Sequence, residues 1–384
     1  FCDEPEIMFN RVLSTSAPFR VPKYYFGDIS RQNTNCILIC EGLKFAKEMK
    51  DHWDPFELWP GPQKNKDTEL PHKGRDHYFA MAQAHAKFVA AYWTDRLGDK
   101  GALAQLFVNF NPELVYGRRE GMSMTPPSQE AIAWFDMQSQ QSMAQVSGMC
   151  ALGCDFALSV CPGVFPKSIS NRRWLEQFRK ELTHVAQYST EVQMYLGSFS
   201  DYFSLTHMNM NIDNALYFQN EAGKLEAGFL DWGSFAHGNP IGTMVGNWGS
   251  GEPDMFDEYE ERLLDHFIEE LEKHGGPKLE KETAVFHMKL SQATGALGHL
   301  GNLTQLYTLH KKQDPIWKSL KDRFDPRIHK VFLMRAFINN WLNFVLLWAS
   351  RTRGPYQHFL RWVAKHKAGL SPKGPPLPPG ENDF

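Results

Sequence analysis

The chain has 384 residues, of which 42% are hydrophobic and 22% charged, and its formal net charge is −3. These values are typical of a globular protein with enough apolar residues for one large domain or two ordinary ones. The small negative charge excludes the strongly basic composition of many nucleic-acid-binding proteins, and we expect no nucleic-acid partner.

The six cysteines include no Cys-x-x-Cys pair. We therefore expect buried thiols in a reducing compartment, either the cytoplasm or the interior of an organelle, between which the sequence does not distinguish. Residues 331–350 form the longest apolar run, which is long enough to span a bilayer. This run contains one arginine and three asparagines, which are costly in lipid, and so it predicts a buried helix and no membrane span.

The chain begins with a segment of helical spacing at residues 4–13, with a proline suited to the first turn. Two strand-like segments follow at residues 21–28 and 36–43, and the second ends in the polar kink Glu41-Gly42-Leu43. Residues 44–75 are rich in proline and predict an irregular surface segment.

Helical spacing returns at residues 77–93, where apolar side chains recur every three or four positions. For His85, within this segment, a packed core position is favoured over a catalytic one. Residues 102–165 alternate loops with helical patches and carry no motif that we recognise. Residues 174–195 predict one further helix.

The most informative stretch runs from Leu205 to Gly233. Two apolar runs, residues 215–218 and 225–230, flank a polar turn and predict a β-hairpin. A loop rich in amides precedes the first strand, and Asp231-Trp232-Gly233 follows the second, so both polar clusters lie at the same end of the hairpin. The oxygens of Asn214 and Asp231 suit Mg²⁺, which takes its other ligands from water and phosphates.

The remainder of the chain is mostly helical in pattern. For the glycines at positions 246, 249 and 251, a flexible loop is favoured over a phosphate-binding loop. Residues 254–274 predict an amphipathic helix that Asp254 caps and Gly275-Gly276 ends. Further helices are predicted at residues 283–297 and 327–350.

The motifs of the hairpin carry a resemblance to a known family. Residues 207–214 resemble the His-Gly-Asp-x-x-x-x-Asn catalytic loop of the aminoglycoside phosphotransferase and choline kinase-like (ecdysteroid kinase-like) family, which is related to the protein kinases. Asp231-Trp232-Gly233 is similar to the metal-binding motif of that family. The resemblance implies an α+β, protein-kinase-like bilobal fold with a truncated small lobe at residues 1–42 and a mostly helical large lobe at residues 43–364. A Pro-rich tail at residues 365–384 is expected to be extended or disordered.

The same resemblance implies roles for individual residues and two cofactors, ATP and Mg²⁺. Asn214 and Asp231 would hold the metal, and His207 would support the catalytic loop structurally. Glu41 and Leu43 match the hinge that binds adenine through its backbone. Glu6 matches the glutamate that pairs with a phosphate-binding lysine, although a solvated helix charge is an equal alternative.

Departures from the family pattern favour loss of catalysis. Asn209 occupies the position of the catalytic aspartate, and an amide cannot accept a proton. Met208 replaces a glycine and Thr243 stands where an aspartate is usual, while the Gly-rich loop and its lysine find no room before the first helix. Asp213 is the only carboxylate left in the loop, and its alternation with Asn214 directs it away from the metal side.

We therefore expect a pseudokinase that acts as a binding or scaffold subunit, with a larger protein assembly as its partner. The alternative is an active ATP-dependent O-phosphotransferase that acts on a hydroxyl of a small molecule, such as an aminoglycoside, choline or an ecdysteroid.

Overall fold

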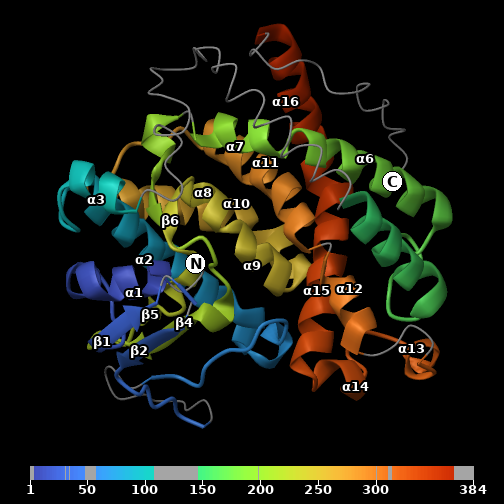
Figure 1. Ribbon diagram of the computed structural model, residues 1–384, viewed down its shortest axis with the longest axis horizontal. Coiled ribbons are helices and arrows are strands. Elements are labelled where there is room, and N and C mark those ends of the chain that lie inside the picture. Colours follow the sequence, from blue (N-terminus) through green and yellow to red (C-terminus); the bar gives the residue numbers. More distant parts are fainter. Residues whose placement is uncertain are drawn as a thin grey trace. The chain divides into compact units, whose positions relative to one another are not determined.

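A computed structural model describes residues 4–30, 32–33, 35–47, 58–107, 146–197, 199–299, 301–309 and 314–366 (Figure 1). Helices dominate this part of the chain, and its strands form three two-stranded antiparallel sheets. The predicted α+β class is therefore confirmed. Residues 108–145 and 367–384 lie outside the described residues. Most of the predicted alternation of loops and helical patches at 102–165 and nearly all of the Pro-rich tail predicted at 365–384 therefore stay predictions.

Backbone contacts divide the chain into two compact units. Unit 1 contains Phe1–Leu114, Phe199–Asn247 and Gly251–Val285, and unit 2 contains Val115–Ser198, Trp248–Ser250 and Phe286–Phe384. The candidate motifs all belong to unit 1. The division into lobes at residue 42 stays a prediction.

Unit 1 begins with the predicted order of one helix and two strands. Helix α1 (Glu4–Val12) is followed by strands β1 (Tyr24–Ile29) and β2 (Cys36–Cys40), which pair antiparallel. Gly27 of β1 lies under α1, where an added Cβ would come within 3.2 Å of Ile7. One face of this small sheet is thus packed on the helix.

The core of unit 1 is built from α2 (Arg75–Trp93) and α10 (Pro253–Lys273), which pack along one another (Figure 1). His85 of α2 and Phe267 of α10 have ring centroids 5.3 Å apart. Gly275, with a φ of 88°, follows the end of α10 as predicted. The prediction that Asp254 caps this helix is wrong: the helix begins at Pro253, and Asp254 lies in its first turn.

The predicted hairpin is confirmed. Strands β4 (Ala215–Gln219) and β5 (Leu225–Phe229) pair antiparallel, with Ala215 opposite Phe229. At the turn, the Asn220 side chain accepts hydrogen bonds from the backbone of Ala222 and Lys224, both at 3.0 Å. A second short pair, β3 (Ser204–Thr206) and β6 (Ala236–Gly238), brings the segments before and after the hairpin together.

The other described helices are distributed over both units. They are α3 (Lys100–Leu106), α6 (Arg172–Gln187), α7 (Ser189–Gly197), α8 (Pro240–Thr243), α9 (Val245–Ser250), α11 (Lys281–His299), α12 (Gly301–Leu309), α13 (Ile316–Ser319), α14 (Pro326–His329), α15 (Phe332–Leu347) and α16 (Arg353–His366). Helices α12 and α15 pack side by side (Figure 1).

Three helix predictions were wrong in detail. The single helix expected at 174–195 is two helices, because the backbone of Tyr188 (φ −109°, ψ 9°) leaves the helical conformation. Residues 327–350 likewise divide at Val331 into α14 and α15. The glycine run expected to be a loop lies mostly in α9. An added Cβ at Gly249 would lie 2.8 Å from the Phe344 ring. The absence of a side chain at this position therefore permits the close approach of Phe344.

None of the described helices has both the length and the apolar content needed to cross a membrane. In α15 the side chain of Arg335 is buried and donates to the carbonyl of His329, while Asn343 donates to the carbonyls of Trp248 and Gly249. The five described cysteines are free. Cys150, Cys154 and Cys161 are buried as expected, whereas Cys36 is exposed and Cys40 is half-buried, which corrects the expectation for those two.

Candidate functional site

The imidazole of His207 joins the amide-rich loop to the end of β5. Its Nε2–H donates to the carbonyl oxygen of Leu230 at 2.7 Å, and its Nδ1 accepts the backbone N–H of Asn209 at 3.3 Å. The ring is 1% exposed, and burial lowers the pKa of His207 to about 4. The histidine is therefore neutral near pH 7, with its proton on Nε2.

Hydrogen bonds between amides hold the loop around Asn209. The Asn214 side chain donates from Nδ2 to the Asn209 carbonyl at 2.9 Å, and the backbone N–H of Asn211 donates to the same oxygen at 2.9 Å. The Asn211 side chain donates to Oδ1 of Asn209. Asn211 was not singled out from the sequence, although Asn side chains two residues apart often bond locally, and that spacing was a usable signal.

The two predicted metal ligands lie at neighbouring backbone positions. The backbone N–H of Leu230 donates to the carbonyl of Asn214 at 2.8 Å, so the ladder continues past β4 and β5, and Asp231 is the next residue. Because Nδ2 of Asn214 bonds a carbonyl, its Oδ1 is directed elsewhere and accepts no hydrogen bond from the described residues. The exposed carboxylate of Asp231 likewise makes no hydrogen bond within the described part of the chain.

The backbone of Asp231 is in the left-handed region, with φ 58° and ψ 67°. Such angles are uncommon for a residue with a Cβ, although aspartate adopts them more readily than most residues, and Asn65, Asp95 and Met208 also have positive φ here. In the described residues no group of three or more His, Cys, Asp or Glu side chains is arranged for a metal. A cation at the hairpin would therefore bind one carboxylate and one amide oxygen and would complete its shell with phosphate or water, which suits Mg²⁺.

Trp232 is the centre of an aromatic cluster beneath this end of the hairpin. Its ring stacks on Phe9 of α1, with centroids 3.5 Å apart and planes 7° from parallel, and lies 4.7 Å from the His207 ring. Helix α1, which carries Glu6, is thereby fixed against the Asp-Trp-Gly motif. Burial and, to a lesser degree, the charge of Glu6 raise the pKa of the Cys40 thiol, so Glu6 lies near the end of β2.

Of the predicted hinge residues, Leu43 packs against side chains of the hairpin. Leu43 and Leu230 pack against a buried cluster of Leu58, Leu216 and Phe218. The Glu41 side chain interacts with the segment before β1. It accepts a hydrogen bond from the backbone N–H of Lys23 at 3.2 Å and lies 4.0 Å from the Arg20 guanidinium. Leu43 therefore lies on the same apolar surface as the residue that precedes Asp231.

Behind the loop is a buried carboxyl group that the sequence did not reveal. Asp67 is 0% exposed and accepts a hydrogen bond from the Tyr78 hydroxyl at 2.7 Å. Burial, with smaller contributions from the charges of Glu252 and Asp213, raises the pKa of Asp67 to about 8. The charge of Asp213 thus acts on this buried cluster. No local pattern signals Asp67, because its hydrogen-bond partner Tyr78 lies 11 residues further along the chain and the nearby charges of Asp213 and Glu252 come from much more distant segments.

Two further residues support the start of the loop. Oγ1 of Thr243 lies 2.7 Å from Oγ1 of Thr206, the residue directly before His207, and the two hydroxyls form a buried pair. His85 donates to the carbonyl of Pro240 at 3.1 Å, and burial lowers its pKa to about 3. The environment of His85 is that of a core histidine, as the sequence indicated.

Comparisons with known proteins yield one similar structure. No family model matches the sequence, and no curated protein matches it. An ethanolamine kinase of Plasmodium vivax is similar in structure, with 11% sequence identity and a TM-score of 0.42 over 92% of this chain and 73% of that chain. The function is therefore argued from the residues of the hairpin.

Proposed function

We propose that unit 1 binds a magnesium–nucleotide complex at the open end of the β4–β5 hairpin and transfers little or no phosphate, as a kinase-like pseudoenzyme that serves a binding or scaffold role. The proposal rests on one observation: Asn214 and Asp231 occupy adjacent places at the end of one ladder, and neither Asn214 Oδ1 nor the Asp231 carboxylate is used by the described residues.

Metal binding accounts for these unused oxygens. The Asn214 side chain uses Nδ2 in the bond to the Asn209 carbonyl, and its Oδ1 accepts no hydrogen bond from the described residues, so this oxygen could bind a cation. The left-handed backbone of Asp231 turns the chain sharply after β5 and presents the carboxylate to solvent. Such a strained backbone is retained when the position of its side chain matters.

The nucleotide base would bind at the hinge. Leu43 and Leu230 are both half-buried and pack on the cluster that contains buried Leu216, and the backbone of Gly42 and Leu43 lies beside them. An adenine ring needs both features, an apolar contact on its face and backbone hydrogen bonds on its edge. The base would then lie next to Leu230, which precedes the proposed metal ligand Asp231.

Weak or absent turnover follows from Asn209. Positioned general bases contribute roughly 10²–10⁴-fold to rate, and the Asn209 amide cannot accept a proton. Its oxygen is also engaged by Asn211. The charge of Asp213, the only carboxylate in the loop, contributes to the raised pKa of buried Asp67 and of buried Tyr217, so Asp213 lies near these two side chains.

Thermal unfolding with ATP, with Mg²⁺ and with both together tests the proposal. Ligand at 100 times its dissociation constant should add about 2.7 kcal/mol to the free energy of unfolding. The increase should require both ATP and Mg²⁺ and should be lost in Asp231→Asn. A protein whose unfolding temperature does not respond to ATP and Mg²⁺ would contradict nucleotide binding.

A matched control is available on the same hairpin. Glu221 is exposed in the turn at the opposite end, so Glu221→Gln removes one carboxylate far from the proposed metal. The variant should respond to ATP and Mg²⁺ as the natural chain does. Rapid ADP release in the presence of small alcohols would instead support the active phosphotransferase.

A further inference from the structure

Unit 2 exposes four large apolar side chains within ten residues. Phe324 is 45% exposed, and Val331, Phe332 and Leu333 are 42%, 49% and 39% exposed. The last three are consecutive and begin helix α15, at the end next to α14 (Figure 1). Contiguous exposed apolar residues mark interaction sites more often than scattered ones do. We call these four residues the apolar patch.

A chain of contacts links the two aromatic side chains of the patch. The Phe324 ring lies 5.8 Å from the His329 ring, centroid to centroid. The carbonyl of His329 accepts a hydrogen bond from Arg335, whose guanidinium carbon lies 5.7 Å from the centroid of the Phe332 ring. Phe324 and Phe332 therefore lie on either side of a shared His329–Arg335 contact.

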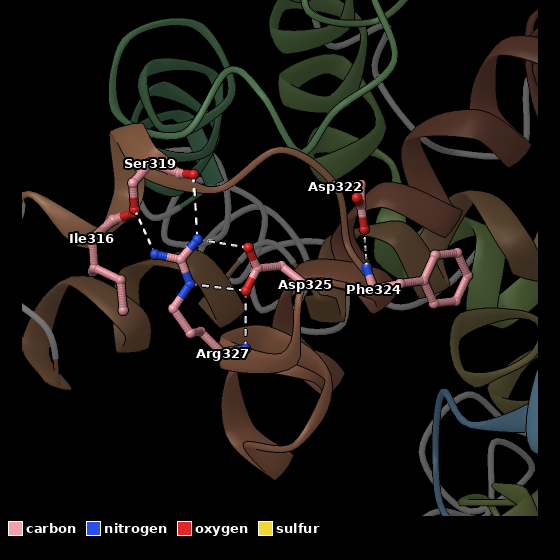
Figure 2. A network of polar contacts seen from close by, with 6 residues as sticks. All are labelled: Ile316, Ser319, Asp322, Phe324, Asp325 and Arg327. Carbon is pink, nitrogen blue, oxygen red and sulfur yellow. Dashed lines mark hydrogen bonds and ion pairs between the residues drawn. The ribbon is translucent and has the colours of Figure 1, made fainter.

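Polar contacts hold the loop beside the patch in one conformation (Figure 2). Arg327 binds the Asp325 carboxylate through two nitrogens, at 2.9 and 2.6 Å, and also donates to the Ser319 hydroxyl at 2.8 Å. Asp322 accepts the backbone N–H of Phe324 at 2.7 Å. Both acidic side chains are thus used within the segment, and Phe324 is presented by an ordered backbone, which lowers the entropy cost of binding.

The segment that carries the patch is rich in basic residues, of which Arg335 is buried and Arg327 is paired with Asp325. Residues 317–335 contain six basic side chains and two acidic ones, although the whole chain has a net charge of −3. The basic residues are Lys318, Lys321, Arg323, Arg327, Lys330 and Arg335, and the acidic ones are Asp322 and Asp325. The three lysines are exposed and form no ion pair within the described part of the chain.

We infer that the apolar patch, with Lys318, Lys321 and Lys330, is a peripheral docking site for an anionic lipid bilayer. Aromatic and aliphatic side chains can enter the boundary between headgroups and acyl chains, while neighbouring lysines meet the negative lipid phosphates. A protein partner is less favoured because lysine is depleted from protein–protein interfaces. This inference does not depend on the proposed nucleotide site, which lies in unit 1.

Sedimentation with vesicles tests the inference. The full chain should bind vesicles of phosphatidylcholine mixed with phosphatidylserine, should not bind phosphatidylcholine alone, and should dissociate at high salt. Each basic residue near an anionic surface contributes about fivefold to partitioning, so replacing all three lysines with glutamine should weaken binding about a hundredfold. Phe332→Ser should weaken it about tenfold.

Matched controls separate docking from general effects of charge and fold. Lys44, Lys47 and Lys224 are exposed in unit 1, and their triple replacement with glutamine should leave vesicle binding within about twofold of the natural chain. Phe26, which is 51% exposed, gives the matched control Phe26→Ser. Thermal unfolding of every variant reports whether the fold is intact.

Three results would overturn the inference, of which the first two concern vesicle binding directly. One is a failure of the natural chain to sediment with anionic vesicles at low salt. The other is equal loss of binding in the control lysine variant. If the natural chain instead self-associates, and Phe332→Ser alone abolishes that association without any vesicle binding, the patch is a protein interface and the lipid assignment is wrong.

Discussion

His207 donates a hydrogen bond from Nε2 to the carbonyl oxygen of Leu230 at 2.7 Å. This bond connects the loop that carries Asn209 and Asn214 to the residue before Asp231, so one buried side chain sets the separation of the two proposed metal ligands. A neutral imidazole suits this role because it donates from one nitrogen while it accepts from the other.

Replacement of His207 by alanine should destabilise unit 1 by about 3 kcal/mol, because the Leu230 carbonyl and the Asn209 N–H lose their partner and a cavity remains beside Trp232. His207→Gln, which keeps a donor near Nε2, should lose less. Chemical denaturation measures both losses. Equal stability of the alanine variant and the natural chain would show that the bond contributes nothing.

Asn209→Asp should create or raise phosphotransferase activity if the rest of the site is intact. The two side chains have the same shape, and one carboxylate oxygen can keep the bond from Asn211 while the other serves as a base. The gain should be roughly 10²–10⁴-fold over the natural chain, measured as ADP release with small alcohols as acceptors. Asn209→Ala is the control and should remain inactive. If the aspartate variant releases no ADP, binding is the only function left for the site.

Gly228→Ala should be strongly destabilising. A Cβ at Gly228 in β5 would lie 1.9 Å from the carbonyl oxygen of Arg20, so the segment before β1 would have to move away from the hairpin. We expect a loss of about 2–4 kcal/mol. At Gly42 an added Cβ meets nothing within 4 Å, and Gly42→Ala should stay within about 0.5 kcal/mol of the natural chain. Urea denaturation of the pair measures the difference.

Stability should fall as pH rises through the range in which Asp67 titrates. Its folded-state pKa is raised from 3.8 to about 8, so the stability it contributes is full below about pH 4 and is lost progressively up to about pH 8. Asp67→Asn keeps an acceptor for Tyr78 and cannot ionise. Its advantage over the natural chain should therefore grow from pH 5 to pH 8, to a value on the order of 3 kcal/mol.

Thermal unfolding of Asp67→Asn at several pH values measures this trend. Exposed Asp28 in β1 provides the control Asp28→Asn. The stability advantage of this variant over the natural chain should not grow from pH 5 to pH 8. A difference between Asp67→Asn and the natural chain that stays constant from pH 5 to pH 8 would mean that Asp67 ionises in the folded state as it does in the unfolded one.

Local pattern was sufficient to predict the elements that position the site. The two apolar runs and the polar turn between them, with Asn220 and Gly223, predicted the β4–β5 hairpin, and helical spacing predicted α2 and α10. These predictions succeeded because the periodicity of a segment reports directly which of its faces is buried. The break at Tyr188 was missed because helical spacing continues on both sides of it, and only packing determines where the backbone leaves the helix.

Local pattern was not sufficient to predict the side-chain contacts that surround the site. The sequence alone determined that Asn214 and Asp231 end the same strand pair, because pairing across a short turn is local. Only the tertiary structure decided that Phe9 stacks on Trp232 and that Asp67 is buried against Tyr78 near the charge of Asp213. These contacts join residues that are not neighbours in the sequence. Their energy depends on which surfaces lose water together, and the periodicity of a segment does not report this.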